Sequence, residues 1–346
     1  MKAMVYHGPG SVRYQEADKP KIEQATDAVV KILKTTICGT DLHILKGDTP
    51  EVPAGLTLGH EGVGIVEEVG SSVKNIKKGD KVLISCITSC GGCRYCKRSL
   101  PAHCEDGGWL LGHLINGTQA EYVRTPHADN SLFVLPPSVD EEAAVMLSDI
   151  LPTGLEIGVL NGKVQPGQII AIVGAGPVGM AALLTAQFYS PAVIIMIDND
   201  DERLAMATQF GATHTINPSR ENVQKAIFAL TNNDGVDVAI ECVGIPATFQ
   251  ACQDIVAKGG IIANVGVHGK PVDLHLEQLW IKNISITTGL VNTTSTPMLL
   301  NVLKSQKIQP QKLVTHRFSM NQFEQAYKVF SNAAAEKAMK VIISAD

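Results

Sequence analysis

The sequence predicts a two-domain α/β protein, in which a β-rich domain accompanies a doubly wound parallel sheet. Its 346 residues are enough for about two domains. Short β-type runs separated by Gly, Pro and Asp fill the first part of the chain, and uninterrupted apolar strands alternating with helices follow. The tail does not continue this alternation. We therefore assign 1–150 and 289–346 to the β-rich domain, and 151–288 to the parallel-sheet domain.

The composition limits the classes of function. A net charge of −5 offers no basic surface on the scale that nucleic acid requires, so we expect no nucleic-acid partner. No apolar run approaches the length of about 20 residues that spans a membrane, and the N-terminus lacks the apolar core of a signal peptide. We expect a cytoplasmic protein without a membrane partner. In that compartment, clustered cysteines serve metal binding or catalysis more often than disulfides.

The elements of the β-rich domain are bounded by turn residues. We expect its strands at Ala28–Lys34, Gly62–Val69, Lys81–Cys86 and Ala120–Val123. In the tail, apolar spacing favours helices at Thr296–Ser305 and Asn321–Ser331, and a last strand at Lys340–Ile343.

The middle of the chain alternates strands and helices. Buried strands are expected at Ile169–Val173, Ala192–Ile197, Val236–Glu241 and Ile261–Val265. Helical composition marks 174–188, and further helices are expected at Asp201–Phe210 and Thr248–Ala257. Such alternation is typical of a parallel sheet with helices on both faces.

A glycine-rich turn predicts a dinucleotide site. The turn Gly174-Ala-Gly176-Pro177-Val178-Gly179 follows a predicted strand and opens a helix, so its free N–H groups can meet a pyrophosphate. Asp198 ends the next strand, where a carboxylate binds the ribose hydroxyls and repels a 2′-phosphate; this favours NAD over NADP. Arg203, about one turn into the following helix, is a further cofactor candidate. The alternative is a glycine-rich turn in an α/β fold without a ligand.

Four of the eight cysteines form a compact cluster, Cys90, Cys93, Cys96 and Cys104. Four thiolates close a tetrahedral Zn²⁺ shell with no position left for substrate, so we expect a structural zinc site. Disulfides and an iron–sulfur cluster are the alternatives, since the spacing is also similar to that of ferredoxins. A catalytic metal would need three ligands and an open position elsewhere.

Four ordered motifs resemble those of the zinc-dependent medium-chain alcohol dehydrogenase family, here of a bacterial type with the structural zinc loop. They are Cys38-Gly-Thr40-Asp41-Leu-His43, Gly59-His60-Glu61 with its following glycines, the four-cysteine loop, and Asp149-Ile-Leu-Pro-Thr153-Gly154 ahead of the glycine-rich turn. The resemblance covers essentially the whole chain. It implies a GroES-like catalytic domain joined to a Rossmann domain.

The resemblance implies a catalytic zinc held by Cys38, His60 and Asp149, with Glu61 able to approach the metal. Asp149 stands where animal enzymes have Cys, and bacterial secondary-alcohol dehydrogenases also place Asp there. Those enzymes generally lack the four-cysteine loop and often use NADP, so the sequence mixes the features of two subgroups.

The resemblance also implies roles for other residues. Zinc acts as a Lewis acid on the alcohol oxygen, and Thr40 passes the proton towards His43. Asp41 is expected to cap local backbone. Cys86, Cys242 and Cys252 are expected to be core residues, although Cys86 could join the pocket wall. The implied cofactor contacts are Val243, Gly266, Val267, Leu290, Val291 and Lys340, for which a surface lysine is the alternative. The implied pocket residues are Trp109, Ile87 and Val291, with His113 as a weaker candidate.

We therefore expect an NAD-dependent zinc alcohol dehydrogenase that acts on small neutral primary or secondary alcohols. It would bind two zinc ions per chain, one catalytic and one structural, and form a homotetramer. A polyol or L-threonine 3-dehydrogenase shares all four motifs and is the alternative within the enzymes. A non-catalytic NAD(H)-binding zinc protein is the alternative from another class.

Overall fold

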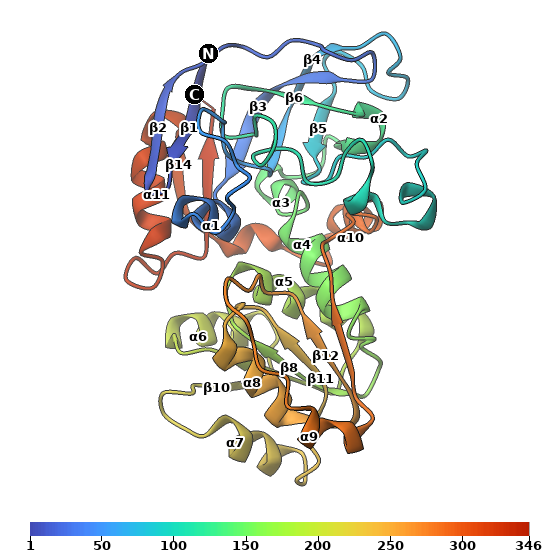
Figure 1. Cartoon of the computed structure of the whole chain (residues 1–346), viewed down its shortest axis with the longest axis vertical. Helices are drawn as coiled ribbons and strands as arrows, with labels where there is room; N and C mark the ends of the chain where they lie inside the picture. Colours follow the sequence, from blue (N-terminus) through green and yellow to red (C-terminus); the bar gives the residue numbers. More distant parts are fainter. Residues whose placement is uncertain (346) are drawn as a thin grey trace. The chain divides into compact units, whose positions relative to one another are not determined.

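The structure is a computed structural model that describes residues 1–345. The chain folds into two compact units, Met1–Asp149 with Asn292–Asp346, and Ile150–Val291 (Figure 1). The second unit thus extends to Val291, beyond the predicted end at 288. None of the helices in residues 1–345 is long and apolar enough to cross a membrane.

The first unit is built on a seven-stranded sheet with the order β14-β15-β3-β4-β5-β7, in which β6 also pairs with β3. All of its pairings are antiparallel except that of β14 with β15. The C-terminal segment thereby returns to this unit and completes its sheet. The strands are β3 (Ala28–Thr36), β4 (Gly62–Val69), β5 (Lys81–Ile84), β6 (Tyr122–Thr125), β7 (Leu132–Val134), β14 (Val314–Ser319) and β15 (Lys340–Ser344), and a separate pair is formed by β1 (Lys2–Gly8) and β2 (Ser11–Glu16).

Short helices accompany this sheet. Apolar side chains of α1, α2 and α11, among them Phe323, join a buried cluster that contains Ile32, Val66 and Ile84 of the sheet. Burial of this kind stabilises a fold by about 25 cal/mol for each Å² of apolar surface. The helices are α1 (Gly39–Lys46), α2 (Ala128–Ser131), α3 (Glu141–Val145), α10 (Thr296–Lys304) and α11 (Phe323–Ser331).

The second unit is a six-stranded parallel sheet with the order β10-β9-β8-β11-β12-β13. When the strands are numbered from β8, this order is 3-2-1-4-5-6, which is the Rossmann arrangement. Successive strands are added in one direction from β8 to β10, and in the opposite direction from β11 to β13. The strands are β8 (Ile169–Val173), β9 (Val193–Ile197), β10 (His214–Ile216), β11 (Val236–Glu241), β12 (Val256–Asn264) and β13 (Ser285–Thr288).

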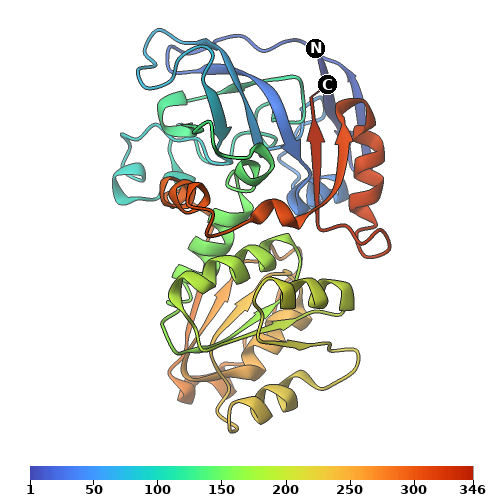
Figure 2. The same cartoon turned by 180° about the vertical axis from the view of Figure 1, so that it is seen from behind.

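Helices cover both faces of the parallel sheet. In Figure 1 α8 lies in front of the sheet, whereas α5 lies in front of it in the reverse view of Figure 2. The inner strands β8 and β9 read as continuous apolar runs because both of their faces are buried. The helices are α4 (Ile150–Thr153), a π-helix at Gly154–Leu160, α5 (Pro177–Ala186), α6 (Asp201–Gln209), α7 (Val223–Leu230), α8 (Pro246–Ile255) and α9 (Leu276–Leu279).

The predicted fold class is confirmed, and most predicted elements end within two residues of the observed bounds. Two boundaries differ for a physical reason. The strand predicted at Lys81–Cys86 stops at Ile84, because the N–H of Cys86 turns to the carbonyl of Ser148. The strand predicted at Ile261–Val265 starts at Val256, and its pairing with β11 shifts register before it reaches Ile261.

Candidate active site

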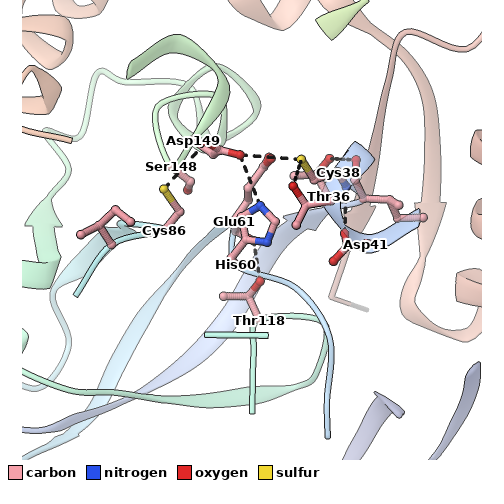
Figure 3. A network of polar contacts seen from close by, with 12 residues as sticks. Thr36, Cys38, Asp41, His60, Glu61, Cys86, Thr118, Ser148 and Asp149 are labelled. Atoms are coloured by element: carbon pink, nitrogen blue, oxygen red, sulfur yellow. Dashed lines mark hydrogen bonds and ion pairs between the residues drawn. The ribbon is translucent and has the colours of Figure 1, made fainter. Parts of the chain in front are cut away.

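Four potential metal ligands of the first unit converge in its interior (Figure 3). The ligand atoms of Cys38, His60, Glu61 and Asp149 all lie within 4.8 Å of one another. The Asp149 Oδ2 atom lies 3.3 Å from His60 Nε2 and 3.7 Å from Cys38 Sγ. The structure therefore brings together residues that are up to 111 positions apart in the sequence.

Cys38 is held by the start of α1. It occupies the N-cap position, and its backbone N–H donates to Asp41 Oδ2 at 2.8 Å, so Asp41 caps the helix. A helix N-terminus favours negative charge, and a thiolate at this position is stabilised by the helix dipole. The hydroxyl of Thr40, in the first turn of the same helix, lies 3.7 Å from Cys38 Sγ.

His60 and Glu61 directly precede β4. Gly59 before them has φ +94°, and a side chain there would collide with Gln119. The Glu61 carbonyl accepts hydrogen bonds from Thr35 and Thr118 hydroxyls, at 2.8 Å and 2.7 Å. These buried contacts fix the backbone from which both side chains project.

Asp149 ends the first unit, at the point where the chain enters α4. Its neighbour Ser148 anchors this point, because the Ser148 hydroxyl accepts from Gly62 N–H at 3.1 Å. On the other side, Cys86 Sγ lies 3.8 Å from Asp149 Oδ1. Cys86 is buried as expected, yet it also borders the cluster.

Lys340 forms a buried ion pair with Glu61. The Lys340 ammonium donates to both Glu61 oxygens, at 2.9 Å and 2.7 Å, and each side chain is 1% exposed. The alternative of a surface lysine is therefore wrong. The implied contact between Lys340 and a cofactor pyrophosphate stays a prediction.

The charges in the cluster favour a bound cation. Burial raises the pKa of both the Cys38 thiol and the Glu61 carboxyl, because it penalises their charged forms. Burial alone would lower the pKa of His60, but hydrogen bonds to Asp149 and Cys38 raise it well above its ordinary value. One sulfur, one imidazole nitrogen and carboxylate oxygens in this space match the donor set of a zinc site. Zn²⁺ fits, because it binds these groups in their deprotonated forms.

The four-cysteine loop forms a second cluster. The sulfurs of Cys90, Cys93, Cys96 and Cys104 lie within 4.8 Å of one another. Backbone N–H groups point to them, from Cys90 to Cys104 Sγ at 3.2 Å and from Cys93 to Cys90 Sγ at 3.4 Å. Hydrogen bonds lower the pKa of Cys93 to about 6, and the one from the Cys96 N–H has the largest effect. This all-sulfur set fits a closed tetrahedral zinc site.

The glycine-rich turn of the second unit is shaped for close approach. Gly174 has φ +104°, and a side chain at Gly179 would collide with the Gly174 carbonyl. Gly176, by contrast, faces open space, with the Arg203 guanidinium as its nearest neighbour. Pro177 and Val178 begin α5, so the helix N-terminus opens beside this space. A phosphate can therefore reach the backbone N–H groups.

Asp198 links this turn to the next strand. Its Oδ2 accepts from Ala175 N–H at 2.7 Å, and its Oδ1 accepts from Asp200 N–H at 2.9 Å. The Arg203 side chain approaches Asp200 at 3.8 Å. Asp198 thus contacts the glycine-rich turn directly, which is the position of a carboxylate that binds the ribose hydroxyls of a dinucleotide.

The other expected cofactor residues lie at the carboxyl ends of β11, β12 and β13. Val243, Val267 and Leu290 are exposed apolar side chains, Val267 to 64%, and Val291 is buried. Gly266 approaches Gly244 so closely that a side chain at Gly266 would collide with its N–H. Ligands of open parallel sheets bind at this edge.

The expected proton-transfer and pocket residues lie in different surroundings. His43 Nδ1 lies 2.7 Å from Asp48 Oδ2 near the surface. The Trp109 ring stands edge-on to the His60 ring, with 6.3 Å between the ring centroids. The His113 ring stacks on the Trp109 ring. Ile87 is buried. Val291 belongs to the other unit.

The sequence analysis missed two features of the sites. The pairing of Lys340 with Glu61 joins residues 279 positions apart, and no local spacing marks it. Glu241, a buried carboxylate at the end of β11, was missed as well, although an acidic residue that closes an apolar strand is a signal. Both depend on the tertiary fold.

Comparisons with known proteins agree with this geometry. Residues 24–137 match the family model "Alcohol dehydrogenase GroES-like domain", and residues 177–305 match "Zinc-binding dehydrogenase". Zinc-type alcohol dehydrogenase B of Aspergillus flavus is 36% identical over 352 residues, covering 100% of this chain and 81% of that protein.

Two solved structures are similar over the full length. Zinc-dependent alcohol dehydrogenase 2 from Streptococcus pneumonia, in its apo form, has a TM-score of 0.96 and 59% identity, covering 100% of this chain and 99% of that one. Alcohol dehydrogenase TADH from Thermus sp. ATN1 has a TM-score of 0.93 and 34% identity, covering 100% of both chains.

Proposed function

The chain belongs to the zinc-dependent medium-chain alcohol dehydrogenase family, and from that premise we propose that it oxidises small neutral primary or secondary alcohols with NAD as the hydride acceptor. The reverse reaction would reduce aldehydes or ketones. The observation that carries the proposal is the buried convergence of Cys38, His60 and Asp149 in a chain that also presents Asp198 at a glycine-rich turn.

The metal-binding role falls to Cys38, His60 and Asp149. When bound there, Zn²⁺ supplies Lewis acidity toward the alcohol oxygen and NAD supplies the hydride acceptor. Asp149 orients the set, because one of its oxygens lies within 3.7 Å of both the sulfur and the imidazole. Both Glu61 oxygens accept from the Lys340 ammonium, so a metal bound by Glu61 would share this carboxylate with Lys340 or displace it.

The proton of the alcohol needs a path out of a buried site. The Thr40 hydroxyl lies beside the cluster and can accept and pass on a proton through its oxygen. His43 lies on the same helix, partly exposed, and its contact with Asp48 holds the ring in one orientation. We assign the relay to Thr40 and then His43.

The choice of NAD over NADP is supported by Asp198. A 2′-phosphate would meet this carboxylate at the place where the ribose hydroxyls bind. Arg203 is the group that could favour NADP, but Asp200 draws its guanidinium to within 3.8 Å. We assign the pyrophosphate to the turn from Gly174 to Gly179.

A second, structural zinc is proposed for Cys90, Cys93, Cys96 and Cys104. The support is the all-sulfur set and its backbone N–H donors, which stabilise thiolates. In this set no position remains for a substrate.

The proposed pocket is apolar. Trp109 stands beside His60, and Ile87 and Val291 are apolar residues of the same predicted set. We infer a preference for neutral substrates, because apolar walls do not compensate the charge of a sugar acid or an amino acid.

We further propose that the chain self-associates in a reducing, cytoplasmic compartment, as a homotetramer. The support for self-association is the outer edge strand β13, which is flanked in sequence by the exposed side chains of Leu276, Trp280 and Ile281. An unpaired sheet edge beside exposed apolar side chains is usually covered in solution. The support for the compartment is that all eight cysteines are free.

A kinetic screen tests the proposed function. Primary, secondary, aromatic and polyol substrates, and L-threonine, are each assayed with NAD and with NADP. The proposal predicts the highest kcat/KM for a simple alcohol with NAD. A strong preference for a polyol or for L-threonine would contradict the proposed simple-alcohol substrate and favour the corresponding dehydrogenase. If no substrate is turned over while NADH still binds, the protein is a non-catalytic NAD(H)-binding protein. Light scattering of Trp280→Glu, compared with wild type, tests self-association.

A further inference from the structure

A buried carboxylate stands at the centre of the parallel sheet. Glu241 is the last residue of β11, and its side chain is 0% exposed. β11 and β8 are neighbours, and the strand order runs outward from them in opposite directions. Ligands of such sheets bind in the crevice outside the carboxyl ends at this reversal. Glu241 therefore lies behind the place where a dinucleotide binds.

Every polar contact of this carboxylate is with a donor. Its Oε1 accepts from Val243 N–H and Gly244 N–H, each at 2.9 Å, and from the Thr248 hydroxyl at 2.6 Å. Its Oε2 accepts from Gly244 N–H at 3.1 Å and lies 3.5 Å from His268 Nε2. The backbone N–H groups of Val243 and Gly244 thus direct their dipoles at this carboxylate.

The orientation of the His268 ring follows from its neighbours. The Asn264 side-chain amide donates to the Gly266 carbonyl, so its Oδ1 is the acceptor for His268 Nε2–H at 2.8 Å. The Nε2 atom is therefore shared between Asn264 Oδ1 and, at 3.5 Å, Glu241 Oε2. The closer contacts of the Glu241 carboxylate are the dipoles of Val243, Gly244 and Thr248.

The carboxylate packs against the two segments that face the crevice. A side chain at Gly266 would collide with Glu241 Oε2, and one at Gly244 would collide with the Val267 carbonyl. Burial first, and then the charge of Glu241, raise the pKa of the adjacent Cys242 thiol. The carboxylate therefore lies directly against the segments that carry Val243 and Val267.

We propose that Glu241 is a fixed negative charge that positions these two segments and favours the oxidised over the reduced nicotinamide. The proposal rests on the proposed function, because it requires the dinucleotide to bind at this crevice. The oxidised ring carries a positive charge that the reduced ring lacks, and a nearby negative charge stabilises the former relative to the latter. The low polarity of the buried site strengthens this difference.

The test compares the affinities of the two cofactor forms in Glu241→Gln. Glutamine keeps the size and one acceptor oxygen but removes the charge. We expect the ratio of the Kd for NAD to the Kd for NADH to rise by about tenfold, because the charge that stabilises the oxidised ring is removed. Glu277→Gln is the matched control, because Glu277 also contacts a histidine, His275, but is 66% exposed. Its ratio should equal that of wild type.

An unchanged ratio in a folded Glu241→Gln protein, or an equal loss of both affinities, overturns the proposal and leaves Glu241 a structural residue. If that variant does not fold, Thr248→Val removes one donor and leaves the charge less compensated. The ratio should then move the opposite way, by about threefold, and an unchanged ratio again overturns the proposal. Wild type that binds neither cofactor form refutes the proposed function instead.

Discussion

The ammonium of Lys340 lies 2.7 Å from Glu61 Oε2, and both side chains are buried. This contact ties the last strand, β15, to the residue that follows His60. Both side chains are 1% exposed, and each is the nearest opposite charge to the other. Removal of one partner leaves the other as an unpaired buried charge.

Lys340→Met should therefore be strongly destabilising. We expect the free energy of unfolding of the zinc-loaded protein to fall by about 3–5 kcal/mol, the usual cost of breaking a buried ion pair. Denaturant unfolding measures it. Lys81→Met is the matched control: Lys81 pairs with Glu141 but is 39% exposed, so its loss should cost no more than about 1 kcal/mol. Equal effects of the two variants would show that burial of the pair is unimportant.

The sulfur cluster should hold one metal independently of the other site. Cys93→Ser removes one of four sulfurs and its backbone-stabilised thiolate. We expect zinc to fall from about two ions per chain to about one, with a lower melting temperature. Elemental analysis of the purified protein measures the content.

Cys252→Ala is the control for that experiment, because Cys252 is buried in the other unit, outside both clusters. It should keep both ions. A Cys93→Ser protein with the metal content of wild type would contradict the assignment of the cluster.

Asp198 should decide between the two cofactors. Asp198→Asn keeps an acceptor for the Ala175 N–H but removes the charge that repels a 2′-phosphate. We expect the ratio of kcat/KM with NADP to that with NAD to rise by about tenfold. Asp201→Asn, at a half-exposed position paired with Arg220, should leave this ratio unchanged. An unaltered ratio in Asp198→Asn would assign cofactor choice to another residue.

Motifs with local spacing were sufficient to predict part of the fold and of the candidate sites. The glycine-rich turn, Asp198 and the four cysteines lie within short stretches, so pattern and chemistry alone placed them. The parallel sheet followed from continuous apolar strands, and the burial of successive residues in β8 and β9 confirms that these strands are covered on both faces.

Residues far apart in the sequence needed other information. Cys38, His60 and Asp149 were assembled only through the family resemblance, because no periodicity relates them. The approach of Cys86 to Asp149 and the pairing of Glu61 with Lys340 depend on how β4, β5 and β15 align in one sheet. Strand register over such separations is a tertiary property, which local propensities do not determine.

The most direct measurement of the central claim is NADH formation from a simple alcohol by zinc-loaded wild type and by Cys38→Ser. The variant replaces the thiolate of the proposed catalytic site but leaves the second unit intact. We predict turnover by wild type and a loss of at least about a thousandfold in kcat for Cys38→Ser, with the Kd for NADH nearly unchanged. Equal rates of NADH formation by the two proteins would contradict the proposed role of this metal site.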